Sequence, residues 1–454
     1  MSLSVVVLAA GQGVRMHSDL PKVLHSIGGR SILERIIQKV SQIEHEQAII
    51  VFGYKGELLK EALAAYPQLL WAEQAERLGT GHATLQALNV MASVDSVLIL
   101  NGDIPFVSTG TLNRLIHETP EDAIGLIAAT VADPKGLGRI VRDATGNFIE
   151  IVEEKDATLD QKKIVEINAG IYLVPKKYLD KWLPEIKSHN AQNEYYLPDI
   201  LPFAKSAGVS IITVSAASEG EVMGVNDKMQ LATLERHFQA TEAKRLMEQG
   251  VTLADPARFD LRGDLIVGKD VCIDINVILE GEVTLGNNVQ LGPNVFIKDA
   301  VLGNDVQILA NSVIEGATLG DGAVVGPFAR VRPGTVLGPA AKIGNFVEIK
   351  NATIGDLSKI NHLSYIGDAT IGESVNIGAG TITCNFDGKK KHRTLIEKGA
   401  SIGAHTQLIA PVSVGENATV GAGTTVTRDV PANALVHNRF ELRCIDNWVK
   451  IKEE

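Results

Sequence analysis

The sequence lacks the features that mark secreted, disulfide-bonded or membrane proteins. Its three cysteines, Cys272, Cys384 and Cys444, lie far apart and form no CxxC pair. We therefore expect no disulfide framework and no zinc site, and a cytoplasmic location with reduced thiols. No apolar run approaches the ~18 residues of a membrane helix. The apolar stretch Val5–Ala10 is too short for the core of a signal peptide, and no basic residue precedes it.

The sequence is also poor in aromatic residues, at 5%, and has no excess of positive charge. With 43 Lys and Arg against 54 Asp and Glu, the net charge of −11 argues against a general binder of nucleic acid or membranes. At ~150 residues per domain, the length suggests about three units, or two large ones. Glycine is concentrated in residues 251–454, which hold 24 of the 43. A glycine-rich half with few aromatics suggests a repeat.

An aliphatic residue recurs in the second half at six-residue steps, and the step usually shortens to five between sets. Period six matches neither a helix nor a free strand, but it fits a chain that turns a corner after every short strand. Three sides would close a coil of roughly eighteen residues, which predicts a parallel β-helix with the aliphatic residues inside. A following glycine would serve a cramped corner or a positive φ. The repeating positions are Leu285, Leu291, Ile297, Leu302, Ile308, Ile314, Leu319, Val325, Val331, Leu337, Ile343, Ile349, Ile354, Ile360, Ile366, Ile371, Ile377, Ile396, Ile402, Leu408, Val414, Val420 and Val426.

The period breaks once, between Ile377 and Ile396, where GAGTITCNFDGKKKHRTL predicts an extruded loop. Its basic run, residues 389–393, is either solvated surface or a contact to an anionic ligand, and the residues alone leave both open. Over residues 251–437 the pattern resembles the left-handed β-helix of the hexapeptide-repeat acyltransferases. That resemblance implies a trimer with acyl-coenzyme A sites between adjacent coils. The repeat indicates the fold far more strongly than the substrate.

The first half reads as a doubly wound, Rossmann-like α/β domain. Residues 4–10 form a continuous apolar run, as in a strand buried on both faces, and further strands are expected at 47–52, 96–100 and 123–130 with helices between the early ones. After the first strand, Gly11 and Gly13 let the backbone approach a phosphate, and Arg15 and Lys22 add positive charge. The stretch has neither the third glycine of a dinucleotide fingerprint nor the ending of a P-loop. A glycine turn used only for packing is the alternative.

LAAGQGVRM with the following LPK resembles the signature of nucleotidyltransferases that join a sugar 1-phosphate to a nucleoside triphosphate. The resemblance implies Mg²⁺ held by Asp103 and Asn226, with Arg15 and Lys22 stabilising charge on the phosphates during in-line attack. Taken alone, Asp103 could equally be a turn or cap residue. The resemblance further implies contacts to the nucleotide, its uracil base and the sugar from Leu8, Ala9, Ala10, Gly11, Lys22, Gln74, Gly79, Thr80, Asp103, Gly138, Glu153, Asn168 and Asn226.

Residues 227–249 are predicted to form a helix between the halves, since leucines and a phenylalanine fall on one face and Gly250 follows. The domains are accordingly expected at 1–226, 227–250 as linker, 251–437, and 438–454 as a tail. In this order and length, the chain resembles the family of bacterial bifunctional N-acetylglucosamine-1-phosphate uridyltransferase/glucosamine-1-phosphate acetyltransferases. The specific stretches are DPARFDLRG, GPFARVRPG, IGNFVEIK, NIGAGTITCN and GTTVTRDV.

The family resemblance implies a general base for acetyl transfer. The residues alone do not decide between His362 and His405; the match of INHLSY to the family favours His362. The resemblance assigns the remaining contacts as glucosamine 1-phosphate sites Arg332, Lys350, Tyr365 and Asn376, and acetyl-CoA sites Ala379, Asn385, Phe386, Ala404, Ala422 and Arg439. Asn101, Phe386 and Ala404 depart from the residues common in the family.

We therefore predict a homotrimeric enzyme that works on small molecules. It would acetylate glucosamine 1-phosphate with acetyl-CoA, then transfer uridylyl from UTP to the resulting N-acetylglucosamine 1-phosphate with Mg²⁺, releasing pyrophosphate. The alternatives are a monofunctional nucleotidyltransferase with a structural β-helix and a non-catalytic scaffold.

Overall fold

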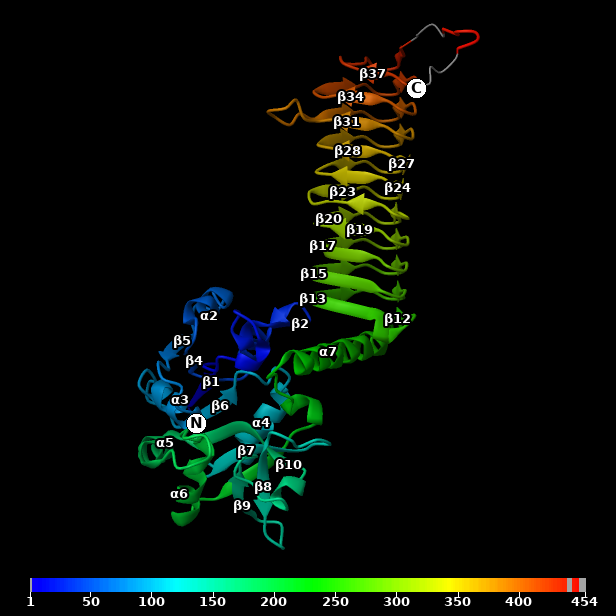
Figure 1. Ribbon diagram of the computed structural model, residues 1–454. Coiled ribbons are helices and arrows are strands. Elements are labelled where there is room, and N and C mark those ends of the chain that lie inside the picture. The colour runs from blue at the N-terminus through cyan, green and yellow to red at the C-terminus, as the bar shows by residue number, and fades with distance from the viewer. Residues whose placement is uncertain (1, 439–442, 449–454) are drawn as a thin grey trace, which may run out of the picture. The chain divides into compact units, whose positions relative to one another are not determined.

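The computed structural model describes residues 2–438 and 443–448 (Figure 1). The chain divides into two compact units, Met1–Phe238 and Gln239–Glu454, and the division falls inside the long helix α7 (Lys228–Glu248). The first half of α7 supplies Leu234 and Phe238 to the core of unit 1, and its second half supplies Ala243 and Leu246 to the core of unit 2. Among the described residues, none of the helices has both the length and the apolarity of a membrane span.

Unit 1 is a three-layer α/β structure around a nine-stranded sheet. Along the sheet the strand order is β11-β7-β10-β6-β1-β4-β5, and β8 and β9 extend it beside β10. The strands are β1 (Leu3–Leu8), β4 (Gln47–Phe52), β5 (Leu70–Glu73), β6 (Ser96–Asn101), β7 (Ile124–Thr130), β8 (Gly138–Arg142), β9 (Phe148–Val152), β10 (Glu166–Pro175) and β11 (Ile211–Ser215), with β2 (Ser26–Ile27) and β3 (Arg30–Ser31) as a separate hairpin. The helices are α1 (Ile32–Val40), α2 (Gly56–Ala62), α3 (Thr80–Leu88), α4 (Thr109–Glu118), α5 (Lys176–Trp182) and α6 (Ile200–Ser206).

Strand β1 shows why this sequence forms a doubly wound sheet. Val5 and Val7 belong to the core beneath α1, α2 and α4, whereas Val6 belongs to the opposite core beneath α3, α5 and α6. Successive side chains of a strand point to opposite faces, so a strand covered on both sides must be apolar throughout. The predicted fold class of this half is confirmed. Strand β10 was not predicted from the sequence, and it runs antiparallel to β6 and β7 in an otherwise mainly parallel sheet.

Unit 2 is a parallel β-helix, as predicted. Its strands pair one coil above the next, always in parallel, in an eleven-stranded and a sixteen-stranded sheet. One face carries β12 (Thr252–Leu253), β14 (Cys272–Ile273), β16 (Gln290–Leu291), β18 (Gln307–Ile308), β21 (Val324–Val325), β24 (Lys342–Asn345), β27 (Lys359–His362), β30 (Asn376–Ile377), β33 (Ser401–Ile402), β36 (Thr419–Val420) and β38 (Leu435–Val436).

The sixteen-stranded sheet supplies the other two faces. It begins with three long strands, β13 (Phe259–Val267), β15 (Val277–Leu285) and β17 (Phe296–Leu302), and then continues as two rows. The row that carries the site described below is β19 (Val313–Glu315), β22 (Arg330–Val331), β25 (Glu348–Lys350), β28 (Tyr365–Gly367), β31 (Ile382–Cys384), β34 (Gln407–Ile409) and β37 (Thr425–Val426). The other row is β20 (Ala317–Leu319), β23 (Thr335–Leu337), β26 (Thr353–Ile354), β29 (Ala369–Ile371), β32 (Thr394–Ile396) and β35 (Val412–Val414).

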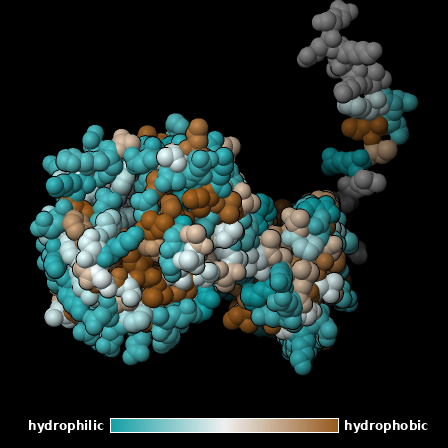
Figure 2. Space-filling view, turned by 90° about the horizontal axis from the view of Figure 1, so that it is seen from below, coloured by the Kyte–Doolittle hydropathy of each residue, from teal (hydrophilic) through white to brown (hydrophobic). Residues whose placement is uncertain are grey.

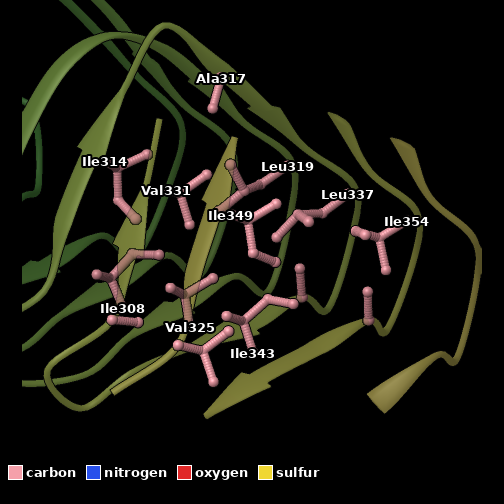
Figure 3. Close-up of a cluster of buried hydrophobic side chains, with 14 of the residues drawn as sticks. Ile308, Ile314, Ala317, Leu319, Val325, Val331, Leu337, Ile343, Ile349 and Ile354 are labelled. Atoms are coloured by element: carbon pink, nitrogen blue, oxygen red, sulfur yellow. The ribbon is translucent and has the colours of Figure 1, made fainter. Parts of the chain in front are cut away.

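The six-residue repeat is the inward-facing set of this β-helix. Side chains such as Ile308, Val325, Ile343 and Ile349 converge inside the coils, each 0–1% exposed (Figure 3). The glycines that follow the aliphatic residues were expected at a cramped corner or at a positive φ. The cramped corner applies to Gly355, where a Cβ would lie 2.5 Å from a backbone atom of the next coil. The repeating residues of the sequence are therefore the buried residues of the β-helix, because each coil places one aliphatic residue on the inside of each face.

The extruded loop is shorter than the break in the period suggests. Strand β31 continues the coil, and only residues 385–393 leave it before β32 begins at Thr394 (Figure 1). Thr383 takes the inward position of β31 at 1% exposure, and its hydroxyl donates to the carbonyl of Gly367 over 3.0 Å. A buried threonine at a repeat position hid this turn from a search for aliphatic residues.

The three cores, two on the faces of the sheet in unit 1 and one inside the β-helix, account for most of the hydrophobic residues, which make up 45% of the chain. On the face shown in Figure 2, hydrophilic side chains cover most of the surface and hydrophobic residues form groups between them. Exposed hydrophobic residues of this kind are normal on folded proteins.

Candidate functional sites

A cavity of about 470 Å³ opens at the carboxyl ends of β1 and β6 in unit 1. The two strands are paired, with Leu8 opposite Asn101, so the segments that follow them meet at one edge of the sheet. Ligands of open α/β sheets bind at such an edge. The predicted residues that line the cavity are Leu8, Ala9, Ala10, Gly11, Lys22, Gln74, Gly79, Thr80 and Asp103.

Lys22 lies between the two predicted metal ligands. Its Nζ donates to Asp103 Oδ2 over 2.6 Å and to Asn226 Oδ1 over 3.2 Å. Gly13 makes room for the lysine, because it has a φ of 67° and a Cβ there would lie 2.5 Å from Lys22 Cβ. The glycine therefore has a packing role as well as any role toward phosphate.

Backbone contacts explain why Asn226 reaches Asp103 from 123 residues away in sequence. The amide of Val225 donates to the carbonyl of Asp103 over 3.1 Å, which ties the end of β6 to the segment before α7. The Asn226 amide in turn donates to Gln230 Oε1 over 2.7 Å, and Asp227 Oδ1 accepts from the Gln230 amide over 2.8 Å. The start of α7 thus fixes the backbone of Asn226 at the sheet edge, and the Asn226 side chain is held there by Lys22.

The two oxygens fit a hard divalent cation. Both point at one cationic nitrogen, so Asp103 and Asn226 already converge on a position of positive charge. Within residues 2–438 and 443–448, no group of three or more His, Cys, Asp or Glu residues is placed to hold a metal. A Mg²⁺ ion bound by one or two protein oxygens, with water and substrate phosphates as the remaining ligands, matches this donor set.

Gln74 is buried beside the start of α3, where it fixes the Gly79–Thr80 turn. Its Nε2 donates to the carbonyl of Gly79 over 3.0 Å and lies 3.1 Å from His82 Nδ1. Gly79 has a φ of 105°, and a Cβ there would approach the carbonyl oxygen of Tyr195 to 2.6 Å. Glycine is therefore required at the position that shapes this end of the cavity.

The three residues predicted to contact the sugar meet in a cluster of their own. Gly138 on β8 pairs with Asn168 on β10, and a Cβ at Gly138 would lie 3.0 Å from Glu153 Oε1. Asn168 Nδ2 donates to the buried Tyr172 hydroxyl over 2.6 Å. Asn101 connects the cluster to the cavity, because its amide packs against Gly170 and it also lines the cavity.

Carboxyl groups crowd around this cluster, and their pKa values respond to it. Burial raises the pKa of Glu153, and the nearby charges of Asp156 and Asp199 add to the effect. Burial, followed by the charge of Asp156, raises the pKa of Asp199 to about 6. The cluster therefore tolerates little additional negative charge.

Two arginines near the cavity differ from expectation. Arg15 is exposed on the short 3₁₀ turn Val14–Met16 and is not part of the cavity lining. Arg77, which the sequence analysis did not select, lines the cavity and donates to Gln12 Oε1, and Glu194 lines it as well. In the sequence, only the nearness of Arg77 to Gly79, and of Glu194 to Tyr195, indicated that these two residues line the cavity.

In unit 2, five residues follow one edge of the β-helix, one coil apart. We call Asn345, His362, Ala379, Ala404 and Ala422 the His362 edge. Each precedes a residue with left-handed φ, and successive coils are joined there by backbone hydrogen bonds, such as Gly380 N to His362 O at 3.3 Å and His405 N to Ala379 O at 2.7 Å. The edge brings the predicted base together with three predicted acetyl-CoA positions.

Asn345 fixes the state of His362. Asn345 Oδ1 lies 2.9 Å from His362 Nδ1. An amide oxygen only accepts, so Nδ1 carries the proton and the lone pair of the neutral ring is on Nε2. Asn345 was not predicted from the sequence, because its position one coil before His362 becomes apparent only when the register of β24 and β27 is known.

A second group lies on the row of strands that contains β25, β28 and β31. Arg332 Nη1 donates to Glu348 Oε1 over 2.7 Å. Lys350 pairs in register with Gly367, and Gly367 is glycine because a Cβ would lie 2.4 Å from the Tyr365 hydroxyl and 2.9 Å from Asn385 Nδ2. Tyr365 and Asn385, predicted to contact different substrates, are thus neighbours.

The basic run of the extruded loop reaches this group through Lys391. The contact and the charge of Lys350 lower the pKa of Lys391, whereas the charges of Asp368 and Tyr365 raise it. Two ammonium groups held close together repel each other unless an anion lies between them. This placement favours the anion-contact interpretation for Lys391 over plain solvated surface.

The remaining predicted positions lie apart. Asn376 is on β30, where it pairs with Lys359 and Ser401 on the face beyond the His362 edge. Phe386 is 60% exposed in the extruded loop, and it forms a bridge with Lys391. Arg439 lies outside the described residues.

Known proteins match both units. The bifunctional protein GlmU of Methylococcus capsulatus is 51% identical over 449 residues, which are 99% of this chain and 97% of that protein. The chain belongs to the GlmU family. GlmU of Nitrosococcus oceani is 52% identical, and GlmU of Stutzerimonas stutzeri is 50% identical, each over 448 residues that cover 99% of both chains.

Family models match segments of both units of the GlmU-type chain. A MobA-like NTP transferase domain matches residues 5–191, a GMPPB C-terminal domain matches 261–342, and six bacterial transferase hexapeptide repeats match 393–428. A nucleotidyl transferase structure from Methanothermobacter thermautotroptrophicus aligns with a TM-score of 0.38 at 20% identity, over 53% of this chain and 99% of that chain, a likeness too weak to bear on function. Membership of the GlmU family confirms the predicted bifunctional transferase, which acts on sugar phosphates and nucleotides in UDP-N-acetylglucosamine synthesis.

Proposed function

We propose that the two units divide the two reactions between them: unit 2 acetylates glucosamine 1-phosphate, and unit 1 joins the product to UTP. The observation that carries this division is that each predicted set of residues meets within one unit. Lys22, Asp103 and Asn226 converge in the first, and His362 shares an edge with Ala379 and Ala404 in the second.

For acetyl transfer, His362 acts as general base. The amine of glucosamine 1-phosphate attacks the carbonyl carbon of the acetyl-CoA thioester, and the carbon–sulfur bond breaks. Nε2 of His362 takes the proton that the amine loses, and the same proton then passes to the leaving sulfur, so that coenzyme A leaves as the thiol and the base is restored. The hydrogen bond from Nδ1 to Asn345 keeps the Nε2 lone pair available for this step.

The cations on the neighbouring row bind the sugar phosphate. Lys350 and Lys391 approach each other, and Arg332 is held by Glu348 nearby in the strand row. Arg and Lys donors suit a phosphate that remains charged throughout the reaction. We call Arg332, Lys350 and Lys391 the phosphate clamp. With the sugar phosphate bound at this clamp and coenzyme A bound along the His362 edge, the acetyl group would lie between the two.

For uridylyl transfer, Lys22 stabilises negative charge that moves onto the transferring and leaving phosphates. The phosphate oxygen of N-acetylglucosamine 1-phosphate attacks the α-phosphorus of UTP, and pyrophosphate leaves. When bound at Asp103 and Asn226, Mg²⁺ supplies charge neutralisation and orientation of the phosphates. Gln74 and the Gly79–Thr80 turn hold the base, and Glu153 and Asn168 hold the sugar.

We propose a homotrimer in the cytoplasm. Asn376 faces away from the row that carries Tyr365 and Lys350, so a sugar contact from this residue is most simply made by a second copy of the chain. The three cysteines are free thiols, as expected in a reducing compartment.

Product analysis of the two half-reactions tests the assignment. Purified protein with glucosamine 1-phosphate and acetyl-CoA should release coenzyme A with or without a metal chelator. With N-acetylglucosamine 1-phosphate and UTP it should form UDP-N-acetylglucosamine and pyrophosphate, and a chelator should stop this reaction until excess Mg²⁺ is added. Uridylyl transfer without any coenzyme A release would instead support a structural β-helix.

A further inference from the structure

Asp368 is a charged residue near the acetyl-transfer site that neither the repeat nor the proposed chemistry uses. It follows β28 at one corner of the β-helix, and the residue is only 6% exposed. A buried carboxylate is unfavourable unless it is paired and hydrogen-bonded. The corner also holds Asp368 at a φ of 49°, a conformation that side-chain-bearing residues adopt infrequently.

We propose that Asp368 is a positioning residue for acetyl transfer, which holds the extruded loop against the coil so that Asn385 and Lys391 face the substrates. This inference rests on the proposed function of unit 2. The ligand affected is the sugar phosphate at Lys350 and Lys391, together with acetyl-CoA at Asn385.

The carboxylate joins three consecutive turns of the chain. Asp368 Oδ1 accepts from Asn351 Nδ2 over 2.6 Å, and Oδ2 accepts from Asn385 Nδ2. Asn351 belongs to the coil before Asp368, and Asn385 is the first residue of the extruded loop. The two bonds use both oxygens. An amide in place of the carboxylate keeps one of them, makes the other only if an asparagine partner turns its own amide round, and removes the negative charge.

The backbone of Asp368 secures the other end of the loop. Its carbonyl accepts from the amide of Thr394 over 3.2 Å, and its own amide donates to the carbonyl of Lys350 over 3.0 Å. Within the loop, the His392 amide donates to the carbonyl of Asn385 over 2.8 Å. Asp368 therefore contacts both ends of the segment that carries Lys391.

The charge environment supports the same role. Burial raises the pKa of Asp368, but hydrogen bonds from Asn351 and Asn385 and the charges of Lys350 and Lys391 outweigh it and leave the pKa below its ordinary value. The carboxylate is thus ionised within reach of the charges of Lys350 and Lys391, whose repulsion it offsets when no phosphate is bound.

A corner aspartate elsewhere in the β-helix provides the comparison. Asp305 also has left-handed φ, at 57°, and also accepts from an asparagine one coil earlier, Asn288, over 3.0 Å. Asp305 is nevertheless exposed. Burial and contact with a loop are therefore not demanded by the corner, and Asp305→Asn serves as a matched control for Asp368→Asn.

The test combines loop proteolysis with kinetics on the full chain. Trypsin cleaves after Lys and Arg, so its attack within residues 389–393 reports whether the loop is held in place. We expect Asp368→Asn to speed cleavage there, and to raise the KM for glucosamine 1-phosphate about tenfold or more, as for loss of a hydrogen bond to a charged group. Uridylyl transfer should keep its kinetic constants, and Asp305→Asn should match the wild type in both assays.

Unchanged loop cleavage and unchanged KM in Asp368→Asn would overturn the proposal, as would an equal effect of Asp305→Asn. A second variant, Asn385→Ala, removes the same bond from the loop side. It should show the same faster cleavage, and normal cleavage there would overturn the proposal even if Asp368→Asn fails to fold. Loop cleavage can be measured whether or not the protein is active, so it tests the role of Asp368 by itself. Absence of coenzyme A release from the wild type would refute the proposed function of unit 2 instead.

Discussion

The hydrogen bond between Asn345 and His362 gives a sharp test of the acetyl-transfer site. In Asn345→Ala the imidazole loses the acceptor that lies 2.9 Å from Nδ1. Nothing then selects the form with the lone pair on Nε2, and the ring is free to turn. We expect kcat for acetyl transfer to fall, with a smaller change in the KM for glucosamine 1-phosphate, because Asn345 itself touches the base rather than the phosphate clamp.

The size of the loss can be bounded. A neutral hydrogen bond contributes about 0.5–1.5 kcal/mol, which corresponds to about two- to twelvefold in rate. A general base contributes about 10²–10⁴-fold in total, so complete loss of the correct ring state sets the upper bound. We expect a reduction near the upper end of the first range, since Asn345→Ala removes both orientation and choice of nitrogen.

The assay is release of coenzyme A under saturating substrates, with uridylyl transfer by the same sample as the internal control. Asn311→Ala is the matched variant, because Asn311 Oδ1 also accepts from an asparagine on an edge of the β-helix, Asn294, over 3.1 Å, but lies two coils before Asn345. A normal kcat in Asn345→Ala, or the same loss in Asn311→Ala, would refute the role assigned to this bond.

Two further predictions follow from close contacts and from burial. Gly367→Ala places a methyl group 2.4 Å from the Tyr365 hydroxyl and 2.9 Å from Asn385 Nδ2. We expect overpacking to destabilise the protein by about 1–3 kcal/mol, and we expect acetyl transfer to be lost while uridylyl transfer is retained. Normal coenzyme A release would show that Tyr365 does not need this position. The pKa of Asp199 is raised to about 6 by burial and by Asp156, so its contribution to stability is present below the unfolded pKa of 3.8 and is lost as the pH rises through 6. Asp199→Asn should therefore match the wild type in denaturant unfolding at pH 4 and exceed it by between about 1 and 3 kcal/mol at pH 8; a difference of the same size at both pH values would contradict this account.

The sequence predicted those parts of the fold that depend on regular spacing. Aliphatic residues such as Ile343 and Ile349 recur every six positions because each face of the β-helix buries one of them, so the pattern and the interior are the same information. Thr383 shows the limit of this reasoning, since a threonine can occupy the inward position when its hydroxyl finds a carbonyl. In unit 1, the antiparallel β10 was missed because its place in the sheet depends on long-range pairing rather than on local pattern.

The candidate sites divide in the same way. Segments directly after β1 and β6 could be expected to meet, because the carboxyl ends of parallel strands share one edge. Asn345 and Asp368 could not be found from the sequence, since each acts on a residue one coil away. The coil length varies, being 17 residues along the register pair Asn345–His362 and 18 along Arg330–Glu348. Buried polar residues of this kind carry no periodic signal and become visible only through their partners.

The division of the two reactions between the two units is tested most directly by crossing two variants with two assays. His362→Ala should abolish coenzyme A release and leave uridylyl transfer at the wild-type rate. Asp103→Ala should abolish uridylyl transfer, since it removes both the oxygen ligand that we propose for Mg²⁺ and the partner of Lys22, and should leave coenzyme A release unchanged. Loss of both activities in either variant, with the chain folded, would contradict the account.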